Sequence, residues 1–220
     1  MKKTFRSLAL AVGCCCGSFA WPEVGHSQGF YLNANAGVSL ADKVNLRQFL
    51  VPTRGAKIDL DPGPRLSVAG GYNFNDYLGV QLETGFIYNN VKSVTGGGSI
   101  DASLSHVPML ADFVVRYDKP DCKWVPYAGA GAGGDVSVIG LDHVSAPNGA
   151  VVDGSAGTVV FAWQAFAGAR YKFNQNMSIG GGYKFFSASG ASWDVHHTSG
   201  EIKTGTAGIH SFGVDFSMKF

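Results

Sequence analysis

The sequence has few charged residues and lacks any long apolar run beyond its first 20 residues. Charged side chains make up 15% of the 220 residues. No segment after the N-terminal one reaches the roughly 18 uninterrupted apolar residues that a membrane-spanning helix needs. Of the 17 basic residues, three (Lys2, Lys3 and Arg6) stand near the start, which leaves 14 against 16 acidic residues. This balance gives no support for a nucleic-acid partner.

The N-terminal segment is typical of an export signal. Lys2 and Lys3 precede an apolar run over residues 8–20, and the segment 18–20 fits the small-x-small cleavage pattern. The run is too short to span a bilayer comfortably. We therefore predict a signal peptide over residues 1–20, with cleavage as late as residue 27 as the alternative.

Cysteine is scarce outside this segment. The four cysteines are Cys14, Cys15, Cys16 and Cys122. The first three lie within the leader, where a lipoprotein signal is the alternative to simple apolar filler, although the leucine expected three places earlier is missing. Only Cys122 then remains after cleavage, which excludes an intrachain disulfide.

Glycine and aromatic residues are plentiful, and the C-terminal segment 206–220 has the clearest pattern. Glycine occurs 31 times, about twice its usual share, and aromatics make up 12%. In the C-terminal segment every second residue is apolar; these are Phe212, Val214, Phe216, Met218 and Phe220. A two-residue period predicts a strand with one apolar and one polar face. In a bacterial outer-membrane barrel the apolar face meets lipid and the polar face lines the lumen.

The same alternation recurs along the chain and predicts eight strands. They cover residues 29–40, 65–74, 77–88, a segment that ends at 117, 124–133, 161–173, 177–185 and 206–220. Four long loops (41–64, 89–101, 134–157 and 187–205) alternate with three short turns, and aromatic residues cluster near both ends of the strands. This pattern indicates an all-β fold over residues 29–220, an eight-stranded antiparallel up-and-down transmembrane barrel with four long extracellular loops.

A soluble sandwich or lipocalin-like barrel would show the same alternation with its apolar face turned inward. The leader, the aromatic residues at both strand ends and the terminal Phe220 favour the membrane barrel.

The polar face of the predicted strands carries eight charged residues. They are Arg65, Glu83, Asp112, Arg116, Arg170, Lys172, Lys184 and Asp215. Charges that face a narrow lumen must pair because desolvation is costly, so we expect a lumen charge network that plugs the barrel. The alternative is a narrow ion path, because the fifth strand is nearly all glycine and alanine after Tyr127 and its facing cannot be assigned from the pattern.

The chain resembles the small eight-stranded outer-membrane barrels of the OmpX, OmpA-barrel and opacity-antigen type. The resemblance covers about residues 29–220 and rests on Gly70–Val80, Pro126–Gly131, Gly181–Tyr183 and the terminal strand that ends in Phe220. It implies a location in the outer membrane of a Gram-negative bacterium, among lipid and lipopolysaccharide. It also implies insertion by the barrel assembly machinery, which reads the final strand. The assembly signal would then consist of Phe212, Val214, Phe216, Met218 and Phe220.

The resemblance does not imply one activity, because this group includes adhesins, anchors, narrow pores and a few lipid-modifying enzymes. We expect a structural or surface-recognition role, adhesin- or antigen-like, through loops that bind an extracellular ligand. We expect no enzyme activity, cofactor or metal. The alternatives are a porin-like narrow pore for ions or small solutes and, third, a lipid A-modifying enzyme.

The third alternative rests on His197-Thr198-Ser199, which is similar to the pair that the outer-membrane lipid A deacylases use as base and nucleophile. The carboxylate that should follow about a dozen residues later is missing. A metal site at Asp194, His196 and His197 is disfavoured because adjacent histidines in an extended chain point in different directions.

Overall fold

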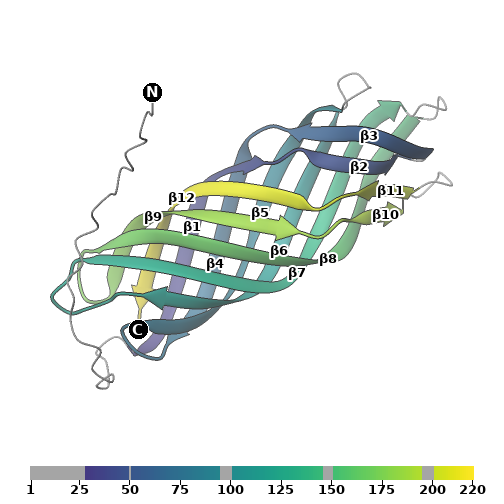
Figure 1. Ribbon diagram of the computed structural model, residues 1–220. Helices are drawn as coiled ribbons and strands as arrows, with labels where there is room; N and C mark the ends of the chain where they lie inside the picture. The colour runs from purple at the N-terminus through teal and green to yellow at the C-terminus, as the bar shows by residue number, and fades with distance from the viewer. Residues whose placement is uncertain (1–27, 50, 95–100, 146–150, 195–200) are drawn as a thin grey trace, which may run out of the picture.

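The alternating strands close into a ring of eight, which confirms the predicted fold class (Figure 1). The computed structural model describes residues 28–49, 51–94, 101–145, 151–194 and 201–220. The ring consists of β1 (Gly29–Ala41), β4 (Gly63–Asn73), β5 (Leu78–Val94), β6 (Ala102–Arg116), β7 (Trp124–Ser145), β8 (Val151–Lys172), β9 (Met177–Ala188) and β12 (Ala207–Lys219). Each strand pairs antiparallel with the next, and β12 pairs with β1 to close the ring.

The two faces of the ring strands differ as the period predicts. On β5, Leu82 is 71% exposed, whereas its neighbours Gln81 and Glu83 are 5% and 3% exposed. On β12, Phe216 is exposed and Asp215 is buried. The apolar side chains therefore cover the outside of the ring, and the polar ones fill its interior.

Aromatic side chains meet at both ends of the outer face. Near the short turns, the ring of Tyr72 contacts those of Phe30 and Phe74 edge-on, at centroid distances of 5.0 and 5.7 Å. Near the other end, Trp163 lies 5.4 Å from Phe185. Rings at these positions suit the two water–lipid interfaces of a membrane.

The predicted long loops are wrong as loops, because most of their described residues form strands. The segment 41–64 contains β2 (Val44–Phe49) and β3 (Val51–Leu60), and the segment 187–205 contains β10 (Ser192–Asp194) and β11 (Glu201–Thr204). These strands pair in the order β10, β11, β2, β3 and join β5. We call these four strands, with the ends of β5, β6, β7 and β8 beside them, the upper tier. In Figure 1 it lies at the end opposite the C-terminus.

The upper tier has the opposite polarity to the ring below it. Val44 and Leu46 on β2 and Ile58 on β3 are buried, while Asn45 and Lys57 between them are exposed. These apolar residues pack in one cluster with Leu60, Leu104, Ile139, Leu141, Trp193 and Ile202. The upper tier thus encloses an apolar core, as a water-soluble barrel does. Prolines and mixed charges in the segment 41–64 conceal this period in the sequence.

Several glycines of β7 and β8, among them Gly129, Gly131 and Gly168, face inward and make room for larger side chains. A Cβ atom on Gly129 would clash with the ring of Phe166, and one on Gly168 would clash with the hydroxyl group of Tyr127. The alternate residues of β7, such as Ala130, face outward. This arrangement settles the facing that the sequence pattern leaves open, and it shows that the space beside these glycines is occupied.

Residues 1–27 lie outside the described residues, so the signal peptide stays a prediction. Within the described ranges, no helix is long and apolar enough to cross a membrane.

We predict that Gly131→Ala destabilises the folded protein by about 1–3 kcal/mol, because the added methyl group has no space. An ideal Cβ atom there would clash with the carboxylate of Asp112 and with the backbone oxygen of Ala111. Urea unfolding in lipid vesicles, followed by tryptophan fluorescence, measures the change.

Gly134→Ala is the matched control for this substitution. Its Cβ atom would lie 4.0 Å from Cγ1 of Val159, which is an ordinary contact. It should shift the stability by no more than about 0.5 kcal/mol. Equal effects of the two substitutions would contradict the account of the inward glycines.

Candidate functional site

The interior of the ring is filled by a polar network centred on Glu83. Its carboxylate accepts hydrogen bonds from Nζ of Lys184 and lies 3.5 Å from Nη2 of Arg65. Arg65 donates to Oε1 of Gln164 at 3.0 Å, and Gln164 in turn donates to Asp112 at 3.0 Å. These residues come from β4, β5, β6, β8 and β9, so the network crosses the lumen from wall to wall.

A second layer of polar contacts lies closer to the short turns. Asp215 accepts hydrogen bonds from Nε of Arg170 and, at 2.9 Å, from the hydroxyl group of Tyr127. The guanidinium group of Arg170 stacks 4.2 Å from the centroid of the Tyr127 ring. The hydroxyl group of Tyr31 on β1 donates to Gln81 on β5 at 3.0 Å. These side chains fill the cross-section between the two walls.

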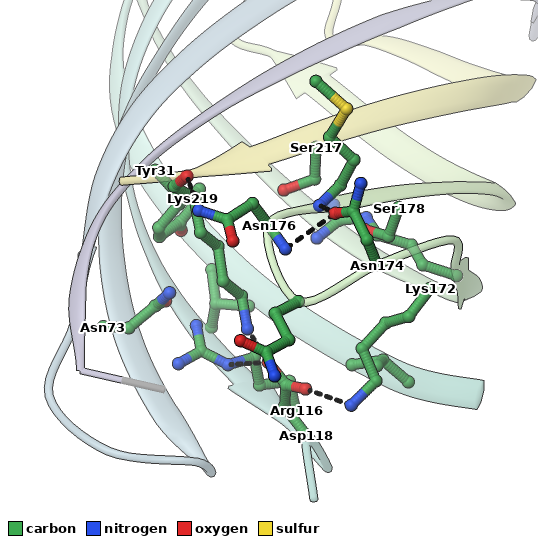
Figure 2. A pocket seen from close by; sticks show the side chains of 15 residues that line it. Tyr31, Asn73, Arg116, Asp118, Lys172, Asn174, Asn176, Ser178, Ser217 and Lys219 are labelled. Atoms are coloured by element: carbon green, nitrogen blue, oxygen red, sulfur yellow. Dashed lines mark hydrogen bonds and ion pairs between the residues drawn. The ribbon is translucent and has the colours of Figure 1, made fainter. Parts of the chain in front are cut away.

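A third layer lies at the mouth beside the short turns and is centred on Asp118 (Figure 2). Lys172 donates to Asp118 at 3.1 Å, Lys219 donates to its other carboxylate oxygen, and Nε of Arg116 lies 3.9 Å away. Burial alone would raise the pKa of Asp118, but the hydrogen bonds and charges of Lys219 and Lys172 outweigh it and lower the pKa below the usual value. Asp118 is therefore ionised at neutral pH.

An apolar layer lies directly on the other side of the central network, towards the upper tier. It consists of Ile87, Leu110, Ala162, Phe186, Ala188 and Ile209. Phe186 and Ile209 are fully buried, two positions along their strands from Lys184 and Ser211 of the polar network. On β9 and β12 the lumen lining thus changes from polar to apolar within one inward-facing step, and the side chains of the apolar layer fill the lumen at this level.

A buried pair of His106 and Asp135 lies between this layer and the upper tier. Nδ1 of His106 is 2.6 Å from Oδ2 of Asp135, and the two side chains are 2% and 0% exposed. The His106 ring also contacts Phe186 at 5.7 Å. The sequence pattern missed this pair because it assigned Asp135 to a loop, whereas β7 extends through it.

The eight charged residues predicted for the lumen all appear in these three layers. Their side chains are buried or nearly so, between 1% and 15% exposed in every ion pair they form there. Four of the five apolar residues of the predicted assembly signal face outward on β12, between β1 and β9, and the fifth, Phe220, directly follows the strand and is exposed. Their role in assembly stays a prediction.

The remaining candidates differ in outcome. His196, His197 and Ser199 lie outside the described residues. Trp193 lies in the segment 187–205, which the sequence predicts as a loop for recognition, but it is 1% exposed and its Nε1 donates to the backbone oxygen of Ser137 at 2.9 Å. That prediction is wrong because Trp193 belongs to the apolar core of the upper tier. Among the described residues no three histidine, cysteine or acidic side chains gather as a metal site.

A family model described as outer membrane protein beta-barrel domain matches residues 7–220. The chain belongs to this family. It is 29% identical over 156 residues to the outer membrane protein PagN of Salmonella typhimurium, a match that covers 62% of each protein. The chain thus spans about three fifths of that relative's length.

Two solved structures have the same fold. Neisserial surface protein A, NspA, superposes with a TM-score of 0.56 at 18% identity over 87% of this chain and 97% of that one. The outer membrane protein OprG of Pseudomonas aeruginosa gives 0.58 at 18% identity over 89% and 98%. These likenesses show the fold alone.

The family membership places the protein in the outer membrane of a Gram-negative bacterium, in contact with its lipid and lipopolysaccharide. Outer-membrane barrels place short turns in the periplasm and long connections outside the cell. The mouth at Asp118 therefore faces the periplasm, and the upper tier lies outside the cell.

We predict that Glu83→Gln destabilises the barrel by about 3–5 kcal/mol, because it leaves Arg65 and Lys184 buried without their carboxylate. The substitution keeps the shape of the side chain, so the loss reports the charge. Urea unfolding in lipid vesicles measures it.

Asp59→Asn serves as the control. Asp59 pairs with Lys43 at 3.2 Å, and the two side chains are 34% and 63% exposed. Removing this surface pair should cost less than about 1 kcal/mol. A cost for Glu83→Gln as small as that of the control would show that the central network does not depend on ion pairing.

Proposed function

We propose that the protein is a surface-recognition protein of the outer membrane, whose upper tier presents a binding face outside the cell. The observation that carries this proposal is the apolar core of the upper tier, which includes Val44, Leu46, Ile58, Trp193 and Ile202. A core of this kind holds paired strands in one conformation. Recognition residues on a rigid scaffold bind with little loss of conformational entropy.

The outer face of β2 and β3 carries the side chains that such a surface needs. Arg47 and Lys57 are exposed, and Asn45 lies directly opposite Lys57 in the ladder. Lys43 and Asp59 form an exposed ion pair beside them. The face therefore combines both charge signs with amide groups, which suits polar recognition in water.

The test uses bacteria that express the protein and adhere to a monolayer of cultured epithelial cells. We expect adherence well above that of bacteria with an empty vector. Reversing both charges with Arg47→Glu and Lys57→Glu should reduce adherence about tenfold, because both side chains lie on the proposed face.

The control variant Lys119→Glu and Lys123→Glu makes the same charge change beside the periplasmic mouth, where it should leave adherence unchanged. Wild-type adherence equal to that of the vector would refute recognition of these cells. Equal losses in the two variants would show that the outer face of β2 and β3 is not the binding face.

The second candidate function, a narrow pore, is less well supported. This candidate rests on the small residues of the segment 124–133, which is part of β7. Tyr127 and Phe166 occupy the space beside the inward glycines there. The paired charges and the apolar layer with Ile87 and Phe186 then close the lumen further.

We predict that the refolded mature chain gives no conductance steps in a planar lipid bilayer. The reason is that paired charges and, above them, the apolar layer with Ile87 and Phe186 fill the lumen. Heat-dependent gel migration must first show that the protein in the bilayer is folded. Steady and reproducible steps would contradict the filled lumen and favour the pore.

A lipid A-modifying activity is the third candidate. It rests on His197 and Ser199 alone, and these residues lie outside the described part of the chain.

A further inference from the structure

The periplasmic mouth contains an open hollow of about 560 Å³ with a strongly cationic wall. Lys123, Lys172 and Lys219 line it together with the amide side chains of Asn174 and Gln175. It continues into a narrow cavity of about 20 Å³, whose wall includes Arg116 and which shares Lys172 and Lys219 with the hollow. The hollow opens at the third lumen layer, whose Asp118, Lys172 and Lys219 form part of its wall.

The charges around this hollow do not balance. Asp118 is the one carboxylate among the described residues that line it, and Lys172, Lys219 and Arg116 all approach that carboxylate within 4 Å. Lys123 adds a fourth cation. Lys172 also donates a hydrogen bond to the backbone oxygen of Lys119 at 2.6 Å. This oxygen carries no charge, so it does not neutralise the lysine.

Among the described residues, nearby acidic groups correct this imbalance only in part. Asp76 and Asp121 belong to the neighbouring turns and do not line the hollow, although the charge of Asp76 acts on Arg116. Asp215 lies deeper and binds Arg170. The hollow therefore keeps a surplus of positive charge, which costs free energy where water is partly excluded.

A buried donor at the inner end of the hollow also lacks a partner. Nε of Arg116 makes no hydrogen bond, although its side chain is only 5% exposed. Figure 2 shows Arg116, Lys172 and Lys219 converging on Asp118 from different sides. Nη2 of Arg116 donates to the backbone oxygen of Asn75 at 2.6 Å, whereas Nε is left without a hydrogen bond and favours an anion near this cavity.

We propose that this hollow binds a phosphate-bearing anion from the periplasmic side. Lysine ammonium groups bind phosphate as point charges, and the charge of a phosphate would offset the surplus of the four cations. The hollow exceeds the size of a bare phosphate, so it has space for an attached glycerol or sugar. The amides of Asn174 and Gln175 offer hydrogen bonds to hydroxyl groups of that attachment.

This chemistry occurs in two sources, a soluble phosphate ester of the periplasm and the headgroup of an inner-leaflet phospholipid. Phe173, which is 60% exposed on the outer face, also lines the hollow. The hollow is thus open to the periplasm and borders the lipid surface. The two sources call for separate probes.

The first probe is glycerol 3-phosphate, titrated calorimetrically into the mature chain folded in a non-ionic detergent. The second is phosphatidylglycerol, mixed into the same detergent and counted on the protein by native mass spectrometry. We expect saturable binding of one equivalent of at least one probe, and about tenfold weaker binding in the variant Lys123→Gln with Lys172→Gln.

The single variant Lys123→Gln is the test if the double variant fails to fold. Lys172 forms an ion pair with Asp118, whereas Lys123 forms no ion pair among the described residues, so its replacement should not disturb folding. It should weaken binding severalfold and leave the unfolding midpoint unchanged. Lys57→Gln, on the upper tier, is the control and should bind like the wild type.

Binding of the soluble ester supports the proposal with a periplasmic source, and binding of the lipid alone supports it with a headgroup as the source. Binding of neither probe overturns the proposal. Binding that Lys123→Gln and the double variant leave unchanged also overturns it, because the anion then lies elsewhere on the protein.

Discussion

The need to pair every backbone hydrogen-bonding group governs this structure. A strand edge in lipid finds no water to replace a missing partner, and each unpaired group would cost several kcal/mol. Pairing of β1 with β12 removes the last open edges of the ring. Closure then fixes the tilt and the narrow width of the barrel. The filled lumen follows from that width, because eight strands leave space for side chains and little more.

The narrow lumen explains both the glycines and the charge pairs. Side chains of neighbouring strands turn into the same narrow space, so a small residue must stand beside a large one, as Gly131 on β7 does beside its ladder partner Asp112 on β6. Charged groups in this space have lost most of their water and are stable only with direct partners. Glu83 therefore contacts both Arg65 and Lys184, and the lumen layers stiffen the barrel that carries the upper tier.

The ring could be predicted from the sequence because the two-residue period of apolar side chains indicates both where a strand lies and which face each of its residues occupies. The lumen positions of Glu83 and Asp215 follow from it. Their partners do not, because Glu83 and Lys184 are 101 residues apart and only closure brings them together. The upper tier was missed for a different reason. Val44, Leu46 and Ile58 keep the same period, but the prolines and mixed charges of the segment 41–64 conceal it. Their burial in a core could not be read either, because lipid-facing and core-facing apolar residues look alike in a sequence.

The reversal of polarity between the ring and the upper tier has a consequence for how the protein sits in its membrane. The outward apolar band ends where the apolar side chains turn inward, between Phe86, which is 43% exposed, and Val44, which is 1% exposed. Sinking deeper would immerse Lys57 and Asn45 in hydrocarbon, and rising would expose Phe86 and Trp163 to water. Both displacements cost free energy through hydrophobic mismatch. The barrel is therefore held at one depth, and its outermost strands keep a constant height above the lipid headgroups.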